Sequence, residues 1–392
     1  MKNKFIIIIA LLAFVVSISC LFGYQKKVAL ADEITDIDCK SKCAYLIDAN
    51  SNTVIYAKNE NQKMPIASMC KVMTLLICFD EIKEGKLKED EFITVSKNAS
   101  SMGGSQVFLE ENGQYTTSEL IKSIVVASAN DACVAMAERI CGSEQSFVDL
   151  MNKKAEELNM KNTVFVNCTG LPKPEQHSSA KDVSIMFSEL IKHDNYFNYS
   201  KIWMDEIKHP QDRITQISNT NKLIKFYKGC DGGKTGYTNE AGHCLVASAN
   251  RENMRLICVV INSPDSKTRF NDVSSMFNYG FANYVNKIII DKNQPLNLNV
   301  TIKGAKNDKI ELVAEKDVSL FNKKNQKRSV EIDFVQTNFE KAPVKKGEKI
   351  GELHIFENNI QIDCINVLVN QEVEQKNYFD FIVEILDNWS IA

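Results

Sequence analysis

Two kinds of hydrophobic pattern alternate along the first two thirds of the chain. Short runs rich in β-branched residues predict strands at 44–48, 53–57, 230–238, 243–249 and 256–261. Apolar residues at helical spacing predict helices at 68–82, 120–127, 132–137, 182–191 and 272–285. The run 68–82 is apolar on nearly all sides, which is typical of a central helix buried by its neighbours. We therefore predict an α/β (α+β) domain with a central antiparallel sheet and helices.

The pattern changes after about residue 286. Alternation at period two over 296–302, 330–334 and 360–365 predicts a small all-β domain with one solvated face. The last segment, 377–389, is apolar on one helical face but carries acidic residues where membrane-surface helices usually carry Lys and Arg. It is therefore expected either to contact a membrane peripherally or to pack against the β domain or another chain.

The N-terminus has the features of a targeting segment. Lys2 and Lys4 precede an apolar run over 5–22, and small residues at Ala29 and Ala31 form a cleavage site. An uncleaved transmembrane anchor is the alternative, because the run is near spanning length. We predict a signal peptide at 1–31, a catalytic domain at 32–290, a β-rich domain at 291–375 and a C-terminal amphipathic helix at 376–392. The protein is then exported and works at the cell wall or the outer face of the cytoplasmic membrane.

Composition indicates which partners are excluded and in what state the cysteines are expected. The 47 basic and 50 acidic residues nearly balance, and no basic block indicates a nucleic-acid partner. Of the 12 cysteines, most lie inside apolar runs, where cysteine behaves as a small hydrophobic residue. We therefore expect buried free thiols. The cysteine spacing predicts no metal site, and no metal or organic cofactor is implied.

Ser68 and Lys71 open the central helical run. Residues three apart lie on one face of a helix, so the hydroxyl and the amine can touch. Burial disfavours the charged form of an amine, and an uncharged amine beside a hydroxyl is a general base beside a nucleophile. The spacing alone is weak evidence, because Ser178 and Lys181 share it and a helix cap would explain Ser68 equally well.

Two further polar groups follow in order. Ser128 and Asn130 lie between the helices at 120–127 and 132–137, where either catalysis or helix capping explains them. Lys234 and Thr235 lie between glycines on a predicted strand, where a substrate could lie along the backbone. The glycine spacing does not match a phosphate-binding loop.

The ordered combination of Ser-x-x-Lys, Ser-x-Asn and Lys-Thr-Gly resembles the penicillin-binding proteins and class A β-lactamases. In detail the chain resembles the low-molecular-mass penicillin-binding proteins, the D-alanyl-D-alanine carboxypeptidases of serine peptidase family S11. The resemblance covers about 44–284 and is carried by Pro65-Ile66-Ala67-Ser68, Ser128-Ala129-Asn130-Asp131-Ala132 and Gly233-Lys234-Thr235-Gly236. The β domain also resembles that family's second domain. Cys70 and Ala129 depart from the usual threonine and glycine.

The resemblance implies an activity: removal of the terminal D-alanine from peptidoglycan stem peptides, with β-lactams as covalent inhibitors. It implies Ser68 as nucleophile, Lys71 as base and Ser128 as proton relay. Asn130, Lys234, Thr235, Gly236, Tyr237 and Arg269 would bind substrate, with the backbone N–H groups of Ser68 and Tyr237 as oxyanion hole. Because like charges oppose each other's protonation, we expect the buried lysine of the pair to be neutral and the other, facing a carboxylate, to stay charged.

Two alternatives stay open from the sequence. A β-lactamase needs a glutamate-activated water, and no glutamate-rich loop with that pattern is evident between 167 and 182. We therefore expect slow release of a penicilloyl group from Ser68. A non-catalytic wall-binding scaffold with the same fold is the second alternative, against which the intact nucleophile, base and relay argue.

Overall fold

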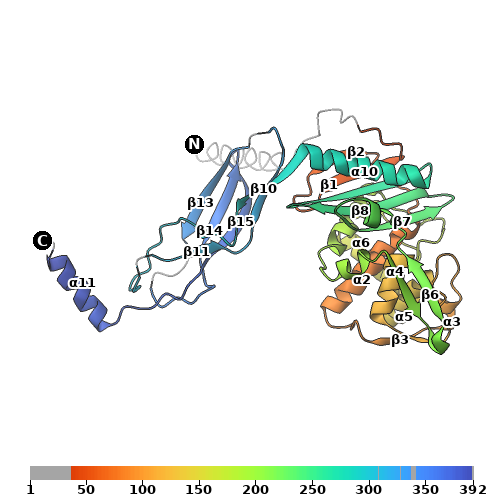
Figure 1. The fold of residues 1–392 in the computed structure, drawn as a ribbon, viewed down its shortest axis with the longest axis horizontal. Helices are drawn as coiled ribbons and strands as arrows, with labels where there is room; N and C mark the ends of the chain where they lie inside the picture. The colour runs from red at the N-terminus through yellow and green to blue at the C-terminus, as the bar shows by residue number, and fades with distance from the viewer. Residues whose placement is uncertain (1–36, 308, 327, 337–340, 391–392) are drawn as a thin grey trace, which may run out of the picture. The chain divides into compact units, whose positions relative to one another are not determined.

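The computed structural model describes residues 37–307, 309–326, 328–336 and 341–390, so the predicted signal peptide lies outside the described residues. Its larger part is built on a five-stranded antiparallel sheet in the order β2-β1-β9-β8-β7 (Figure 1). The strands are β1 Cys43–Asp48, β2 Val54–Lys58, β7 Cys230–Thr238, β8 Gly242–Arg251 and β9 Met254–Ser263. The predicted central antiparallel sheet is confirmed.

The strand order places the Lys234 strand at one side of the sheet. Of the two strands that follow it in the chain, only β8 pairs with β7, whereas β9 pairs with β8 and β1. A short β8–β9 turn carries the chain away from β7 and places β9 in the middle of the sheet. β7 is therefore an edge strand of this sheet.

Helices cover both faces of the sheet. α10 lies on one face, and the helices around α2 lie on the other (Figure 1). The longer helices are α2 Lys71–Lys83, α4 Thr117–Ala127, α5 Asn130–Cys141, α6 Glu144–Glu157, α7 Ala180–Leu190 and α10 Ser266–Asn283. The short helices are η1 Ala67–Cys70, α3 Lys97–Ser100, α8 Tyr196–Ser200, η2 Pro210–Asp212 and α9 Leu223–Phe226. Two hairpins, β3 Phe92–Thr94 with β4 Gln114–Thr116 and β5 Met204–Lys208 with β6 Ile214–Ser218, complete this part.

The central helix is buried as its apolar circumference predicts. Every residue of α2 from Lys71 to Phe79 is buried, and α4, α5, α6 and α7 all pack against it. The run does not begin as an α-helix, however. Ser68 lies on the 3-10 turn η1, in which side chains three residues apart eclipse each other more closely than in an α-helix.

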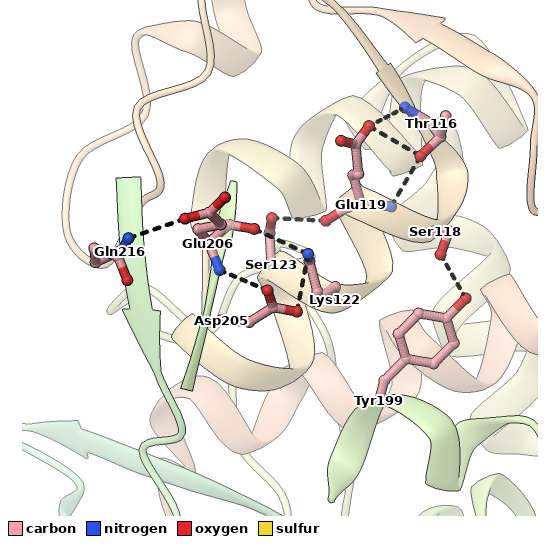
Figure 2. A network of polar contacts seen from close by, with 9 residues as sticks. All are labelled: Thr116, Ser118, Glu119, Lys122, Ser123, Tyr199, Asp205, Glu206 and Gln216. Atoms are coloured by element: carbon pink, nitrogen blue, oxygen red, sulfur yellow. Dashed lines mark hydrogen bonds and ion pairs between the residues drawn. The ribbon is translucent and has the colours of Figure 1, made fainter. Parts of the chain in front are cut away.

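Polar contacts fix α4, the helix that ends next to Ser128. Figure 2 shows its capping box, in which Thr116 and Glu119 satisfy each other's backbone N–H groups. Lys122 Nζ contacts Asp205 Oδ2 at 3.1 Å and donates to the carbonyl of Glu206, which joins the helix to β5. These contacts fix the position of α4 relative to β5.

The remaining strands form the predicted β-rich region. The pairs and sheets are β10 Tyr284–Ile290 with β12 Val318–Lys323, and β11 Leu312–Ala314, β15 Ile360–Val369, β14 Lys349–Glu357 and β13 Val330–Gln336 in that order. The expected strand at 296–302 is wrong: only Leu296 makes an isolated bridge, to Leu312. The alternate apolar side chains of this segment do pack on the β core. The alternation therefore predicted correctly which side chains are buried, but the backbone does not pair as a strand.

The C-terminal helix α11 spans Tyr378–Ser390. None of the helices in the described ranges has both the length and the apolar character needed to cross a membrane. The predicted domain boundaries at 290 and 375 stay predictions.

The prediction of buried free thiols is confirmed for the described residues. All eleven of their cysteines are free, and those classed as buried are Cys39, Cys43, Cys70, Cys78, Cys133, Cys168, Cys230, Cys244 and Cys258.

Candidate active site

Ser68 and Lys71 form the centre of the site. Lys71 Nζ lies 3.0 Å from Ser68 Oγ, and the lysine side chain is fully buried while Ser68 is half-buried. Burial lowers the pKa of Lys71. A hydroxyl held against an amine that resists protonation has the geometry of a nucleophile with its base.

Neighbouring thiols do not restore the charge of Lys71. Burial raises the pKa of Cys70, and it raises the pKa of Cys133 to about 12. Both thiols are therefore neutral at pH 7 and contribute no negative charge. The lowered pKa of Lys71 is thus a consequence of burial.

The segment from Asn167 to Gly170 contacts this pair through its backbone. Lys71 Nζ donates to the carbonyl of Thr169, and Cys70 Sγ donates to the carbonyl of Asn167 at 3.3 Å. Gly170 has φ +83°, and a Cβ there would lie 2.9 Å from Ser68 N and closer still to the carbonyl of Ala67. Only glycine lets the chain pass this close to the backbone of the nucleophile. The Gly170-Leu171-Pro172 turn was the one available signal.

Ser128 and Asn130 come from the junction of α4 and α5, as expected. Ser128 is buried and ends α4 in the left-handed conformation, with φ 63° and ψ 32°. Asn130 Nδ2 donates to the carbonyl of Gly103 at 2.6 Å. Since a carbonyl only accepts, the amide oxygen faces the other way, and this buried Oδ1 has no hydrogen-bond partner. It can accept an N–H group from a ligand.

The segment before β4 was also missed as part of the site. Asn130 N donates to the carbonyl of Ser105, and a Cβ on Gly104 would lie 2.7 Å from Asn130 Nδ2. Asp131 accepts N–H groups from Val107 and Leu109, which anchors the same segment. These contacts run through backbone atoms, so side-chain patterns carry little trace of them.

Edge strand β7 brings Lys234 and its neighbours to the nucleophile. A Cβ on Gly236 would lie 3.2 Å from Ser68 N, so the strand backbone passes directly beside Ser68. Lys234 and Thr235 are buried, whereas Tyr237 is 56% exposed and stacks on His243 with ring centroids 4.4 Å apart. The fold therefore brings β7, the strand of the predicted substrate-binding residues, beside η1, the turn that carries Ser68.

The two lysines are less different than expected. Lys234 is 2% exposed and Lys71 is 0% exposed, so the expected contrast between a buried and an unburied lysine is wrong. Burial, followed by the charge of Lys71, lowers the pKa of Lys234 well below its ordinary value. What distinguishes them is that Lys71 touches Ser68 Oγ, whereas Lys234 Nζ contacts the carbonyl of Thr235 at 3.3 Å.

Arg269 reaches the same strand from α10. Its Nη1 donates to the carbonyls of Gly236 and Cys244 at 3.2 Å, and its buried Nε has no partner. Burial lowers its pKa to about 10. Arg269 therefore braces the carbonyl that precedes Tyr237 and adds positive charge near Lys234.

The repeated motif elsewhere in the chain does not build such a pair. Lys181 is exposed, and Ser178 is buried with its hydroxyl 2.8 Å from Thr163 Oγ1. Ser96 and Ser248 share the Ser-x-Asn spacing of Ser128, but Ser96 caps α3 and Ser248 contacts Asp231. These serines have structural roles, which separates them from Ser68 and Ser128.

Comparison with known proteins agrees with this geometry. Residues 28–265 match the family model described as D-alanyl-D-alanine carboxypeptidase, and 284–375 match that of the penicillin-binding protein 5 C-terminal domain. The chain is 38% identical to D-alanyl-D-alanine carboxypeptidase DacF of Bacillus subtilis over 352 residues, 90% of each chain. It is 30% identical to DacC of Escherichia coli, with 88% of each chain covered. The crystal structure of penicillin-binding protein 5 from Haemophilus influenzae superposes with a TM-score of 0.67 at 28% identity, over 88% of this chain and 100% of that one.

Proposed function

The chain belongs to the D-alanyl-D-alanine carboxypeptidase family, and from this membership we propose the roles of its individual site residues. The protein is a serine-type D-alanyl-D-alanine carboxypeptidase that acts on peptidoglycan peptides and binds penicillin. We assign Ser68 as the nucleophile and Lys71 as its base. The observation that carries this assignment is the 3.0 Å contact between Ser68 Oγ and the buried Lys71 Nζ.

The proposed reaction has two steps. Ser68 Oγ attacks the carbonyl carbon between the two D-alanines as its proton passes to Lys71 Nζ. The C–N bond then breaks, Ser128 relays a proton to the leaving amine, and D-alanine departs from an acyl-enzyme. Water hydrolyses this ester and returns the proton to Ser68.

The remaining residues are proposed to hold the substrate. The unpartnered Asn130 Oδ1 accepts the N–H of the substrate peptide. Lys234 and Thr235 bind the terminal carboxylate, whose negative charge favours the protonated amine of Lys234. The Arg269 cation opposes protonation of Lys234, but it attracts the same carboxylate. The N–H groups of Ser68 and Tyr237 bind the carbonyl oxygen, and Gly236 keeps the two backbones close.

The direct test is release of D-alanine from a peptide ending in D-Ala-D-Ala, with intact-protein mass spectrometry of the benzylpenicillin adduct. We expect D-alanine release, one adduct on Ser68 and slow loss of that adduct. Rapid turnover of benzylpenicillin would indicate a β-lactamase, and peptide binding without D-alanine release would indicate a scaffold. Neither alternative is favoured by the relatives described above.

The pH dependence of acylation follows from the two lysines. Burial lowers the pKa of Lys71 and of Lys234 below the ordinary 10.5, and their charges interact, so the pair loses its protons in two linked steps. Acylation needs a neutral Lys71 and a charged Lys234. The second-order rate constant with benzylpenicillin should therefore rise as the first proton leaves and fall as the second leaves. A profile that is flat up to pH 10.5 would contradict the assignment of Lys71 as base.

Cys70 allows a milder prediction. Its thiol donates to the carbonyl of Asn167 at 3.3 Å, a bond that a threonine hydroxyl can also make. Cys70→Thr should therefore change the acylation rate by less than about tenfold, or about 1.4 kcal/mol in barrier. Cys70→Ala, which loses the donor, is the matched comparison. A much larger loss in Cys70→Thr would show that this position is tightly coupled to the base.

We also propose that the protein is exported by residues 1–31 and works on the outer face of the cytoplasmic membrane, held there by α11. Exposed apolar residues of α11 include Tyr378, Phe379, Val383 and Leu386. Because the helix carries acidic side chains, apolar contact would hold it rather than charge. Full-length protein should therefore cosediment with zwitterionic phosphatidylcholine vesicles, and a chain ending at Lys376 should not. Equal cosedimentation of the two would rule out α11 as the contact.

A further inference from the structure

A second cluster of reactive side chains lies in the β-rich region, on strands β14 and β15. His354 and Cys364 are directly opposite each other in the antiparallel pair. Glu352 lies two residues before His354 and therefore points to the same face of the sheet. Leu353 and Ile355, which alternate with them, are buried in the β core. The strand register thus places an imidazole, a thiol and a carboxylate together at the surface.

The three side chains converge on one point. Glu352 Oε2 lies 3.3 Å from His354 Nε2 and 3.7 Å from Cys364 Sγ, and the sulfur lies 4.0 Å from His354 Nε2. Ligand atoms about 2.0–2.3 Å from a tetrahedral zinc ion lie about 3.3–3.7 Å from each other. The three atoms are therefore already within a few tenths of an ångström of that spacing.

Further hydrogen bonds orient two of these three side chains, His354 and Glu352. His354 Nδ1 lies 3.3 Å from Gln361 Oε1, which only accepts, so Nδ1 carries the proton and Nε2 can present its lone pair to the cluster. Glu352 Oε1 is bound by Lys349 Nζ at 2.6 Å, which leaves Oε2 facing the imidazole and the thiol. A histidine held by its other nitrogen is the usual arrangement of a metal ligand.

We propose that Glu352, His354 and Cys364 bind a zinc ion, with water as the fourth ligand. Thiolate, imidazole and carboxylate are the ligand types that zinc takes in proteins. Binding displaces the Cys364 proton to solvent, and the thiolate and carboxylate together balance the charge of the ion. The site would join two adjacent strands of the β region and needs none of the residues around Ser68.

A simpler arrangement competes with this proposal. A doubly protonated His354 could donate to both Gln361 and Glu352 as an ion pair, with Cys364 a bystander. The two arrangements differ in one measurable respect, because only the metal site depends on the thiol.

The test is titration of the reduced full-length protein with Zn²⁺ by calorimetry, and with Co²⁺ by absorption. We expect one ion per chain and a thiolate-to-cobalt charge-transfer band. Cys364→Ala and His354→Ala should each weaken zinc binding by more than about a hundredfold, and Gln361→Ala by about tenfold. Cys141→Ala, which removes another thiol that is not fully buried, should bind zinc unchanged.

Two results would overturn the proposal. One is no zinc uptake by the wild type, which would leave the His354–Glu352 ion pair. The other is zinc uptake that persists in Cys364→Ala, which would place the ion elsewhere. Melting curves and benzylpenicillin labelling of each variant separate loss of the site from loss of the fold.

Discussion

Replacing Ser68 by alanine is expected to abolish both D-alanine release and covalent labelling by benzylpenicillin. The substitution removes the only atom that the proposed mechanism joins to the substrate, while Lys71 and its contact with Thr169 stay in place. Loss of the nucleophile in a serine hydrolase lowers turnover by roughly a millionfold. Free D-alanine and the intact mass after benzylpenicillin treatment are the two measurements.

Ser178→Ala is the matched control for this change. Ser178 belongs to the same Ser-x-x-Lys spacing but contacts Thr163 rather than a lysine. It should lose about 1 kcal/mol of stability with its hydrogen bond and keep its labelling. A penicilloyl adduct that persists in Ser68→Ala would show that another residue is acylated.

Lys71→Arg is expected to have the next largest effect. Arginine keeps its proton under all ordinary conditions, so it cannot take the proton of Ser68 even though it preserves the charge. A general base contributes about a hundredfold to ten-thousandfold, and the acylation rate should fall by that amount. The second-order rate constant with benzylpenicillin measures this loss directly.

Two further variants distinguish a loss of catalysis from a loss of folding. Lys71→Met removes the charge from the buried site and should acylate as poorly as Lys71→Arg, so the loss cannot be blamed on a buried cation. Lys181→Arg, at the exposed lysine of the repeated spacing, should be indistinguishable from wild type. If Lys71→Arg kept its rate within about tenfold of wild type, a different base would have to be found.

Much of the catalytic architecture was predictable because its signals are local. The capping box at Thr116, the buried circumference of α2 and the Ser128 junction are each encoded within a few residues. Local patterns also predicted β7 as a glycine-rich strand. They did not predict its partners, since strand order depends on how distant segments return to the sheet.

The features of the site that the sequence did not predict depend on backbone atoms or on how deeply a side chain is buried. Thr169 and Gly103 act through their carbonyl oxygens, which every residue type possesses, so no side-chain pattern marks them. The burial of Lys234 was missed because glycines stand on both sides of Lys234-Thr235. In sequence these glycines indicate an open surface, but in the fold they let other backbone segments of the same chain approach β7 closely. Similarly, alternation at 296–302 described which side chains face the core and not whether the backbone pairs.

The free cysteines have a consequence for the lifetime of the protein. Since nearly all described thiols are buried, a folded molecule offers oxidants little to attack. An unfolded molecule offers all of them at once, and wrong pairings then trap it before it can refold. Heat unfolding should therefore be reversible with a reductant present and irreversible in air. Outside a reducing compartment, the survival of this enzyme would depend on how rarely it opens.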